Sequence, residues 1–198
     1  MQLPFRVVLA TASRWRAQLL SDTGIPVELL AAPIDEGAIT APDPVGLALA
    51  RARAKADAVL ALLGNPAGTV VIGADQVAHM DGLAFGKPEH PADHRGRLRQ
   101  LRGRTHTLST AVALRGSLAR ALGDDADFVE HTTLRFRADV PDAEIDAYVS
   151  SGDGSGCAGG YRAEGPGAWL IERVDGDWSN VIGLPVFGVL ERLRRLAR

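Results

Sequence analysis

The sequence predicts a mixed α/β fold in which helices cover the faces of a β-sheet. Apolar, β-branched segments of strand length alternate with helical segments along the chain, which is typical of sheets packed against helices. A hairpin pattern in the middle of the chain adds antiparallel strands to that sheet. No internal repeat or low-complexity linker divides the 198 residues, so we expect one domain over residues 1–198.

The first elements follow from short apolar runs and from residues that stop helices. Residues 3–10 predict a buried strand, and residues 14–22 predict a helix that ends before Pro26. Residues 27–31 predict a second strand, which Pro33 closes.

The next segment alternates between loop, helix and strand. The acidic, proline-containing residues 35–44 predict a loop, and the Ala- and Leu-rich residues 45–63 predict the longest helix. Residues 69–74 are almost wholly apolar and β-branched, which indicates a strand covered on both faces. Strands at 77–80 and 83–86, joined by the turn Asp81-Gly82, predict a hairpin.

The remaining elements are predicted from the same periodicities and from proline starts. Helices are expected at 91–101, 142–149 and 185–196, strands at 107–114, 132–137 and 168–173, and a loop at 116–128.

Composition excludes several classes of protein. With 22 basic and 24 acidic residues the net charge is −2, which disfavours a nucleic-acid binder. The sequence has neither an apolar run long enough to span a membrane nor a signal-peptide pattern at its start. Cys157, the single cysteine, cannot form an internal disulfide, so we expect a cytoplasmic protein.

Two segments carry candidate chemistry. Ser13 stands where an N-cap belongs, and Arg14 and Arg16 follow in the first helical turn. Because cations oppose the helix dipole there, this pattern favours a bound anion, although solvated arginines on a capped helix explain it equally well. Asp75 follows the apolar strand 69–74, and ligands gather at the carboxyl ends of such strands, although a turn residue is an equal alternative.

Other patterns are weaker. Gly86-Lys87-Pro88 is not a Walker A motif, because Asp81 and Pro88 replace its essential residues, but Lys87 can reach a phosphate as a point charge. Glu36 and Lys55 alone would be read as solvated. His90 and His94 have helical spacing but no third ligand, so a metal site there is disfavoured.

These fragments together resemble the Maf family of nucleoside triphosphate pyrophosphatases over almost the whole chain. The matching blocks are Leu9-Ala10-Thr11-Ala12-Ser13-Arg14-Trp15-Arg16, Asp35-Glu36, Lys55-Ala56, Gly73-Ala74-Asp75, Gly86-Lys87-Pro88, Gly103-Arg104-Thr105-His106, Ala158-Gly159-Gly160-Tyr161 and Val181-Ile182-Gly183-Leu184-Pro185. Thr11 and Arg14 depart from the serine and proline usual in the family. Any one block is weak evidence, but their order and spacing are specific.

The resemblance implies two lobes around a central cleft, as in Maf and ITPase-like proteins, and hydrolysis of the α–β phosphoanhydride. It implies Asp75 as proton acceptor and Glu36 with Asp75 as ligands of Mg²⁺ or Mn²⁺. The side chains implied to grip the triphosphate are Ser13, Arg16, Lys55 and Lys87. The family is commonly dimeric, which allows a homodimer.

Three positions resemble the branch of the family that acts on 7-methyl-GTP. These are Trp15, Gln76 and Glu164, where the pyrimidine branch typically has Arg, Thr and Gln. A cationic 7-methylguanine favours an indole face, and a carboxylate can accept its N–H groups. A pyrophosphatase for UTP, CTP or dTTP and a non-catalytic nucleotide sensor in cell division are the alternatives.

Overall fold

The computed structural model describes residues 2–198 and has a seven-stranded mixed sheet with helices on both faces. The strands are β1 (Arg6–Ala10), β2 (Val27–Leu29), β3 (Thr69–Met80), β4 (Leu83–Phe85), β5 (Thr105–Arg115), β6 (Asp127–Phe136) and β7 (Ile171–Asp175). The α-helices are α1 (Arg14–Ser21), α2 (Pro44–Leu62), α3 (Pro91–Leu101), α4 (Asp142–Ser150), α5 (Trp178–Ile182) and α6 (Val186–Leu196). The predicted fold class is confirmed.

The sheet changes from parallel to antiparallel at β3. Its order is β2-β1-β3-β5-β6-β7, and β4 pairs with the far end of β3. β1 runs parallel to both of its neighbours, β2 and β3. The pairs β3–β5, β5–β6 and β6–β7 are antiparallel. The predicted hairpin is confirmed, because Ala78–Met80 pair with β4, and Asp81 and Gly82 both adopt the positive φ of its turn.

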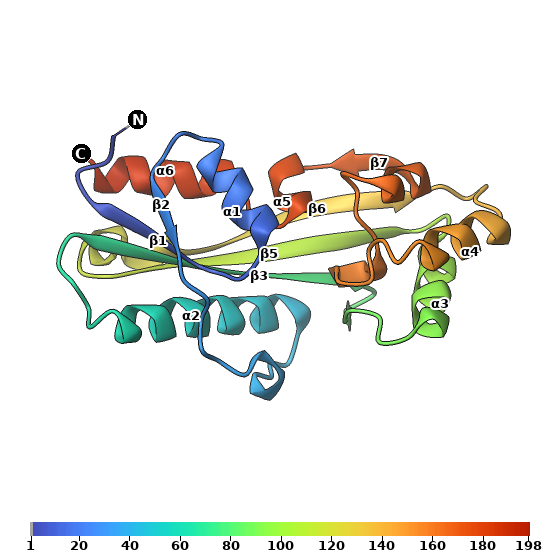
Figure 1. The fold of residues 1–198 in the computed structure, drawn as a ribbon, viewed down its shortest axis with the longest axis horizontal. Coiled ribbons are helices and arrows are strands. Elements are labelled where there is room, and N and C mark those ends of the chain that lie inside the picture. Colours follow the sequence, from blue (N-terminus) through green and yellow to red (C-terminus); the bar gives the residue numbers. More distant parts are fainter. Residues whose placement is uncertain (1) are drawn as a thin grey trace.

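Three clusters of buried apolar side chains form the core, two of them at one end of the molecule and one at the other end (Figure 1). At one end α2 packs on one face of the sheet, while α1 and α6 pack on the opposite face. At the other end α3 and α4 cover the extended antiparallel strands through a third apolar cluster. The two ends share the long strands β3, β5 and β6.

The predicted end of the strand at Ala74 is wrong, because β3 continues through Asp75 to Met80. β5 pairs with β3 from Val71 to His79 and so stabilises the whole length. An aspartate that is unfavourable in an isolated strand is therefore carried by tertiary pairing.

Smaller differences lie at the ends of elements. The predicted strand 168–173 begins only at Ile171, because residues Pro166–Leu170 form a 3₁₀ helix, η4. The predicted loop 116–128 contains the 3₁₀ segment η2 (Leu118–Ala126) and the start of β6. α5 was not predicted. It is too short to show a helical period, and Asp177 caps it by accepting hydrogen bonds from Ser179 N and Asn180 N.

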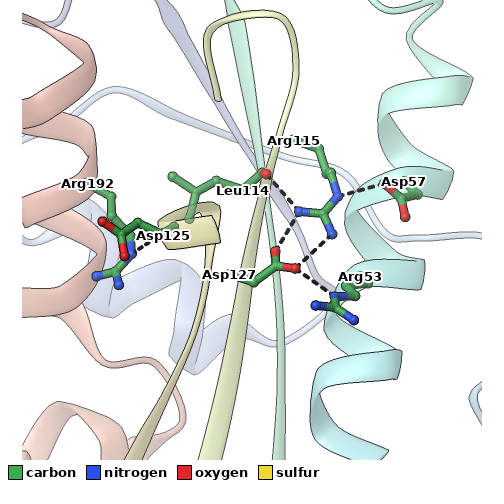
Figure 2. A network of polar contacts seen from close by, with 7 residues as sticks. All are labelled: Arg53, Asp57, Leu114, Arg115, Asp125, Asp127 and Arg192. Carbon is green, nitrogen blue, oxygen red and sulfur yellow. Dashed lines mark hydrogen bonds and ion pairs between the residues drawn. The ribbon is translucent and has the colours of Figure 1, made fainter. Parts of the chain in front are cut away.

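An ionic network fastens α2 to the sheet, as Figure 2 shows. Asp127 of β6 accepts hydrogen bonds from Arg115 at 2.6 Å and from Arg53 of α2 at 2.6 Å. Arg115 also donates to Asp57 of α2 at 2.9 Å.

Among residues 2–198, no helix has both the length and the apolar character that crossing a membrane requires.

Candidate active site

A cleft of about 980 Å³ lies between the two ends of the molecule. This volume matches that of ligand pockets in proteins. The cleft brings together every residue that the sequence singled out for chemistry: Ser13, Trp15, Arg16, Glu36, Lys55, Asp75, Gln76, Lys87 and Glu164.

The cleft crosses a stretch of β3 that has no neighbouring strand on one of its two edges. β1 ends at Ala10, opposite Gly73, and β4 begins its pairing at Ala78. Residues 74–77 therefore form a short free edge, at the carboxyl end of β1. Asp75 and Gln76 point to opposite faces of the strand, yet both line the cleft because this edge is open.

Lys55 joins two carboxylates at the floor of the cleft. Its Nζ lies 2.7 Å from Asp75 Oδ1 and 3.0 Å from Glu36 Oε2. The side chains of Lys55 and Asp75 are each 8% exposed, whereas that of Glu36 is 50% exposed. The second oxygen of Asp75, Oδ2, is buried and has no hydrogen-bond partner among residues 2–198. A buried carboxylate oxygen left free is costly, which points to a functional use.

Gly73 makes the Lys55–Asp75 contact possible. A Cβ atom at Gly73 would lie 2.1 Å from Ala52 O and 2.8 Å from Ala56 N, both in α2. Only glycine therefore lets α2 approach β3 this closely. Lys55 lies on the helix between those two alanines, so the glycine of the Gly-Ala-Asp block sets the position of the ammonium.

Positive charge extends from Lys55 toward the mouth of the cleft. Burial alone would raise the pKa of Glu36, but Lys55, followed by Arg51 and Lys87, outweighs it and holds the pKa of this carboxyl below 4.5. Lys87 is exposed at the rim. Glu36 is thus an anion at neutral pH within a cationic surrounding.

The loop before α1 supplies the next wall. Ser13 caps α1, as predicted, by accepting a hydrogen bond from Arg16 N at 3.5 Å. Arg16 donates its Nε to Gly183 O at 2.7 Å and Nη1 to Ala74 O at 3.1 Å. Burial lowers the pKa of the Arg16 guanidinium, while Asp75 and then Glu36 oppose that shift. Arg16 therefore anchors α1 to β3 through Nη1 and to the end of α5 (Trp178–Ile182) through Nε, and within residues 2–198 Nη2 remains for a ligand.

Gln76 has a fixed orientation. Its Nε2 donates to Asn180 O at 2.6 Å and to Thr110 Oγ1 at 3.0 Å. Because a backbone carbonyl can only accept, the amide nitrogen must face Asn180. Both hydrogen bonds that the Gln76 side chain makes within residues 2–198 use this nitrogen, so Oε1 remains as an acceptor for an N–H group.

Trp15 and Glu164 meet at Arg162, a residue that the sequence analysis missed. The guanidinium carbon of Arg162 lies 4.5 Å from the centre of the Trp15 ring, and its Nε lies 3.1 Å from Glu164 Oε1. Arg162 directly follows the Ala-Gly-Gly-Tyr block, but one arginine in a loop gives no signal of its own in a sequence.

Two buried histidines hold the loop that carries Arg162. His94 of α3 donates from Nε2 to Gly160 O, and His106 Nε2 lies 2.5 Å from the Tyr161 hydroxyl. Burial, followed by the nearby His79, lowers the pKa of His106 to about 4, so its ring is neutral at pH 7. Both histidines thus support the loop.

The carboxylates can accommodate a divalent cation. Asp75 Oδ2 is a buried oxygen with no partner in the described part of the chain, and Glu36 contacts the same Lys55 ammonium as Asp75. Residues 2–198 contain no group of three or more His, Cys, Asp or Glu side chains arranged to hold a metal. Mg²⁺ needs only one or two carboxylates when phosphate oxygens and waters complete its shell, so these residues fit a cation that arrives with a phosphate ligand.

Comparison with known proteins gives the family. The profile described as Maf-like protein matches residues 6–196 of this chain. The chain belongs to the Maf family. Maf membership explains why the spaced blocks, separate in sequence, line one cleft.

Relatives within the Maf family carry different substrate names. A nucleoside triphosphate pyrophosphatase from Streptomyces coelicolor is 41% identical, over 96% of this chain and 88% of that protein. A dTTP/UTP pyrophosphatase from Geotalea uraniireducens is 35% identical, over 99% and 97% of the two chains. A 7-methyl-GTP pyrophosphatase from Burkholderia lata is 36% identical, over 96% and 90%. Overall identity thus does not separate the two kinds of substrate.

Proposed function

We propose that this Maf-family chain hydrolyses the α–β phosphoanhydride of a nucleoside triphosphate, with 7-methyl-GTP as the preferred substrate. The observation that carries the proposal is Asp75. One of its oxygens is fixed by Lys55 at 2.7 Å, the other is buried without a partner among residues 2–198, and Asp75 lines a cleft that further cations also line. The relatives named as pyrophosphatases support the same reaction.

The proposed reaction assigns one role to each side chain at the floor of the cleft. Water attacks the α phosphorus, and Asp75 Oδ2 accepts its proton. The bond from the α phosphorus to the bridging oxygen breaks, so pyrophosphate leaves and the nucleoside monophosphate remains. Lys55 holds Asp75 in position through Oδ1.

The triphosphate is bound by groups around the rim. Lys87 and the free nitrogen of Arg16 supply positive charge, and the Ser13 hydroxyl can donate to a phosphate oxygen. Glu36 and Asp75 would hold a divalent cation, which would neutralise phosphate charge as the reaction proceeds. Stabilising charge that develops on the phosphates is a large term in such reactions.

Three further residues of the cleft, Trp15, Gln76 and Glu164, support the choice of a guanine base. Gln76 Oε1 can accept an N–H from the base, because its Nε2 is already bonded to Asn180 O and Thr110 Oγ1. Trp15 offers an indole face, which favours the positive charge of 7-methylguanine. Glu164 can accept from the N1–H and the exocyclic amine while neutralising the ring.

A second candidate is a pyrophosphatase for dTTP and UTP. Relatives with that name match this chain as well as the 7-methyl-GTP pyrophosphatase does, at 39% identity for the Deinococcus radiodurans protein. Uracil and thymine also carry an N–H that Gln76 Oε1 can accept.

A nucleotide panel tests both candidates. Purified protein with Mg²⁺ or Mn²⁺ is incubated with 7-methyl-GTP, GTP, UTP, dTTP and CTP, and phosphate is measured after inorganic pyrophosphatase is added. We expect the highest kcat/KM with 7-methyl-GTP, and phosphate only when the second enzyme is present. A higher kcat/KM with UTP or dTTP would replace the substrate assignment, and no turnover of any nucleotide would refute the proposed reaction.

A further inference from the structure

Arg162 occupies the two groups that the proposed function assigns to the base. Its guanidinium carbon lies 4.5 Å from the Trp15 ring centre, within the range of a cation–π interaction. The same guanidinium forms ion pairs with Glu164 at 3.1 Å and with Asp153 at 2.9 Å. The indole face and the carboxylate are therefore engaged by the protein itself.

We propose that Arg162 is an internal competitor for the nucleobase, which binds by displacing its guanidinium from Trp15 and Glu164. The inference rests on the proposed function, because it takes these two residues as partners of the base. A cationic base would restore both lost interactions, since it places a positive charge over the indole and beside the carboxylate.

The displaced guanidinium has a place to remain. Asp153 pairs with Arg162 Nη1, and Asp153 is itself fixed by a hydrogen bond from the Tyr148 hydroxyl at 2.7 Å. The backbone N–H of Arg162 donates to the same hydroxyl at 3.0 Å. The main chain of Arg162 is thus held while its side chain can turn from Glu164 toward Asp153 alone.

The contact also joins the two ends of the molecule. Trp15 belongs to α1, which packs with the apolar cluster containing Leu20, whereas Arg162 lies between Tyr161 and Ala163 of the opposite cluster. A base that stacks on the Trp15 surface covered by Arg162 must break the Trp15–Arg162 contact. The interaction therefore opposes binding of a base at that surface.

Arg14 provides a matched control. Its guanidinium carbon also lies 4.5 Å from the Trp15 ring centre. Within residues 2–198, however, Arg14 makes no ion pair, so it does not compete for Glu164. Loss of Arg14 removes one positive charge at the same distance from the Trp15 ring without releasing the carboxylate.

The test is the affinity for α,β-methylene analogues of GTP and 7-methyl-GTP, measured by titration calorimetry so that turnover is not needed. For Arg162→Ala we expect Kd to fall about three- to tenfold for both analogues, from the loss of one competing cation–π contact and one ion pair. Arg162→Lys should lie between wild type and Arg162→Ala, and Arg14→Ala should not lower Kd. Removing an arginine from a site for a polyanion would ordinarily weaken binding, so the sign of the change is decisive.

An unchanged or higher Kd in folded Arg162→Ala would overturn the inference, as would an equal fall in Arg14→Ala. If Arg162→Ala does not fold, Arg162→Gln, which keeps a donor for Asp153, takes its place under the same criterion. The preference for 7-methyl-GTP is tested separately, by the ratio of the Kd values of the two analogues in the wild-type protein. Equal Kd values for the GTP and 7-methyl-GTP analogues would contradict that preference without bearing on Arg162. Displacement precedes stacking for either base, so that ratio is expected to stay constant across the Arg162 variants.

Discussion

Lys55 Nζ lies 2.7 Å from Asp75 Oδ1, in an ion pair whose two side chains are each 8% exposed. The pair leaves Asp75 Oδ2 buried and without a partner in the described residues. Removing one member of a buried ion pair leaves an uncompensated charge, which costs more than the pair itself contributes. The stability of the fold and the chemistry of the site are therefore linked at this contact.

Lys55→Met is expected to lower the free energy of unfolding by about 3 kcal/mol, because the Asp75 carboxylate is left buried without its cation. The double variant Lys55→Met/Asp75→Asn should recover part of that loss, since it leaves no buried charge. Urea denaturation of wild type, both single variants and the double variant measures the effect. Purely additive losses would contradict the coupling of the two residues.

Glu36→Gln is expected to raise the Mg²⁺ or Mn²⁺ concentration needed for half-maximal activity by about tenfold or more, because a neutral amide is a poorer ligand than a carboxylate. Metal titration of the initial rate measures this shift. Asp35→Asn is the control, because Asp35 only caps the 3₁₀ turn η1 (Glu36–Ala38) by accepting from Gly37 N at 2.9 Å. An identical metal requirement in Glu36→Gln would remove Glu36 from the proposed metal site.

The triple variant Trp15→Arg/Gln76→Thr/Glu164→Gln is expected to shift preference from 7-methyl-GTP toward UTP or dTTP. It removes the indole face and the carboxylate that favour a cationic purine. The ratio of kcat/KM values for the two substrates, measured in the triple variant and in each single variant, reports the change. If the ratio stays at its wild-type value, base selection lies in other residues.

Asp127→Asn is expected to destabilise the fold by about 1 kcal/mol at pH 7. Burial would raise the pKa of Asp127, but Arg115 and Arg53 outweigh it and hold that pKa below 3.8. The contribution of the Asp127 ion pairs to the free energy of unfolding is therefore complete at pH values above the ordinary pKa of an aspartate. It is lost as the pH falls through the lower pKa that Asp127 has in the folded protein.

Unfolding free energies of wild type and Asp127→Asn, measured from pH 7 to pH 2, should therefore converge in acid. Asp139→Asn is the control, because Asp139 pairs with Arg137 at 2.6 Å with both side chains largely exposed, and it should change little. A difference between wild type and Asp127→Asn that persists unchanged at pH 2 would contradict the assignment.

The sequence was sufficient to predict the order of most elements, because that order depends on local patterns, whereas most residues of the cleft were implied only by the family resemblance. The β-branched run at 69–74 indicates a strand, and Ser13 indicates a helix start. Convergence of Glu36, Lys55 and Asp75 was implied by the family resemblance. Burial of Lys55 was not predictable, since a lysine in an Ala-rich helix is normally solvated, and it follows here from the close approach at Gly73.

The continuation of β3 and the role of Arg162 depend on contacts between distant segments. Asp75 was predicted at the end of a strand, but β5 pairs with β3 on both sides of it. The actual feature is the end of β1 at Ala10, which leaves the edge of β3 open. The spacing of His90 and His94 gives no sign of a structural role, because the hydrogen bond of His94 to Gly160 depends on how α3 packs against the loop.

The proposed role of Asp75 is tested most directly by the kcat of Asp75→Asn with the best nucleotide of the panel, measured as nucleoside monophosphate and pyrophosphate by chromatography. An amide cannot accept the proton of the attacking water, so kcat should fall by about 10²- to 10⁴-fold while circular dichroism stays unchanged. Asp35→Asn should keep the wild-type rate. A kcat within about threefold of wild type in folded Asp75→Asn would contradict the account.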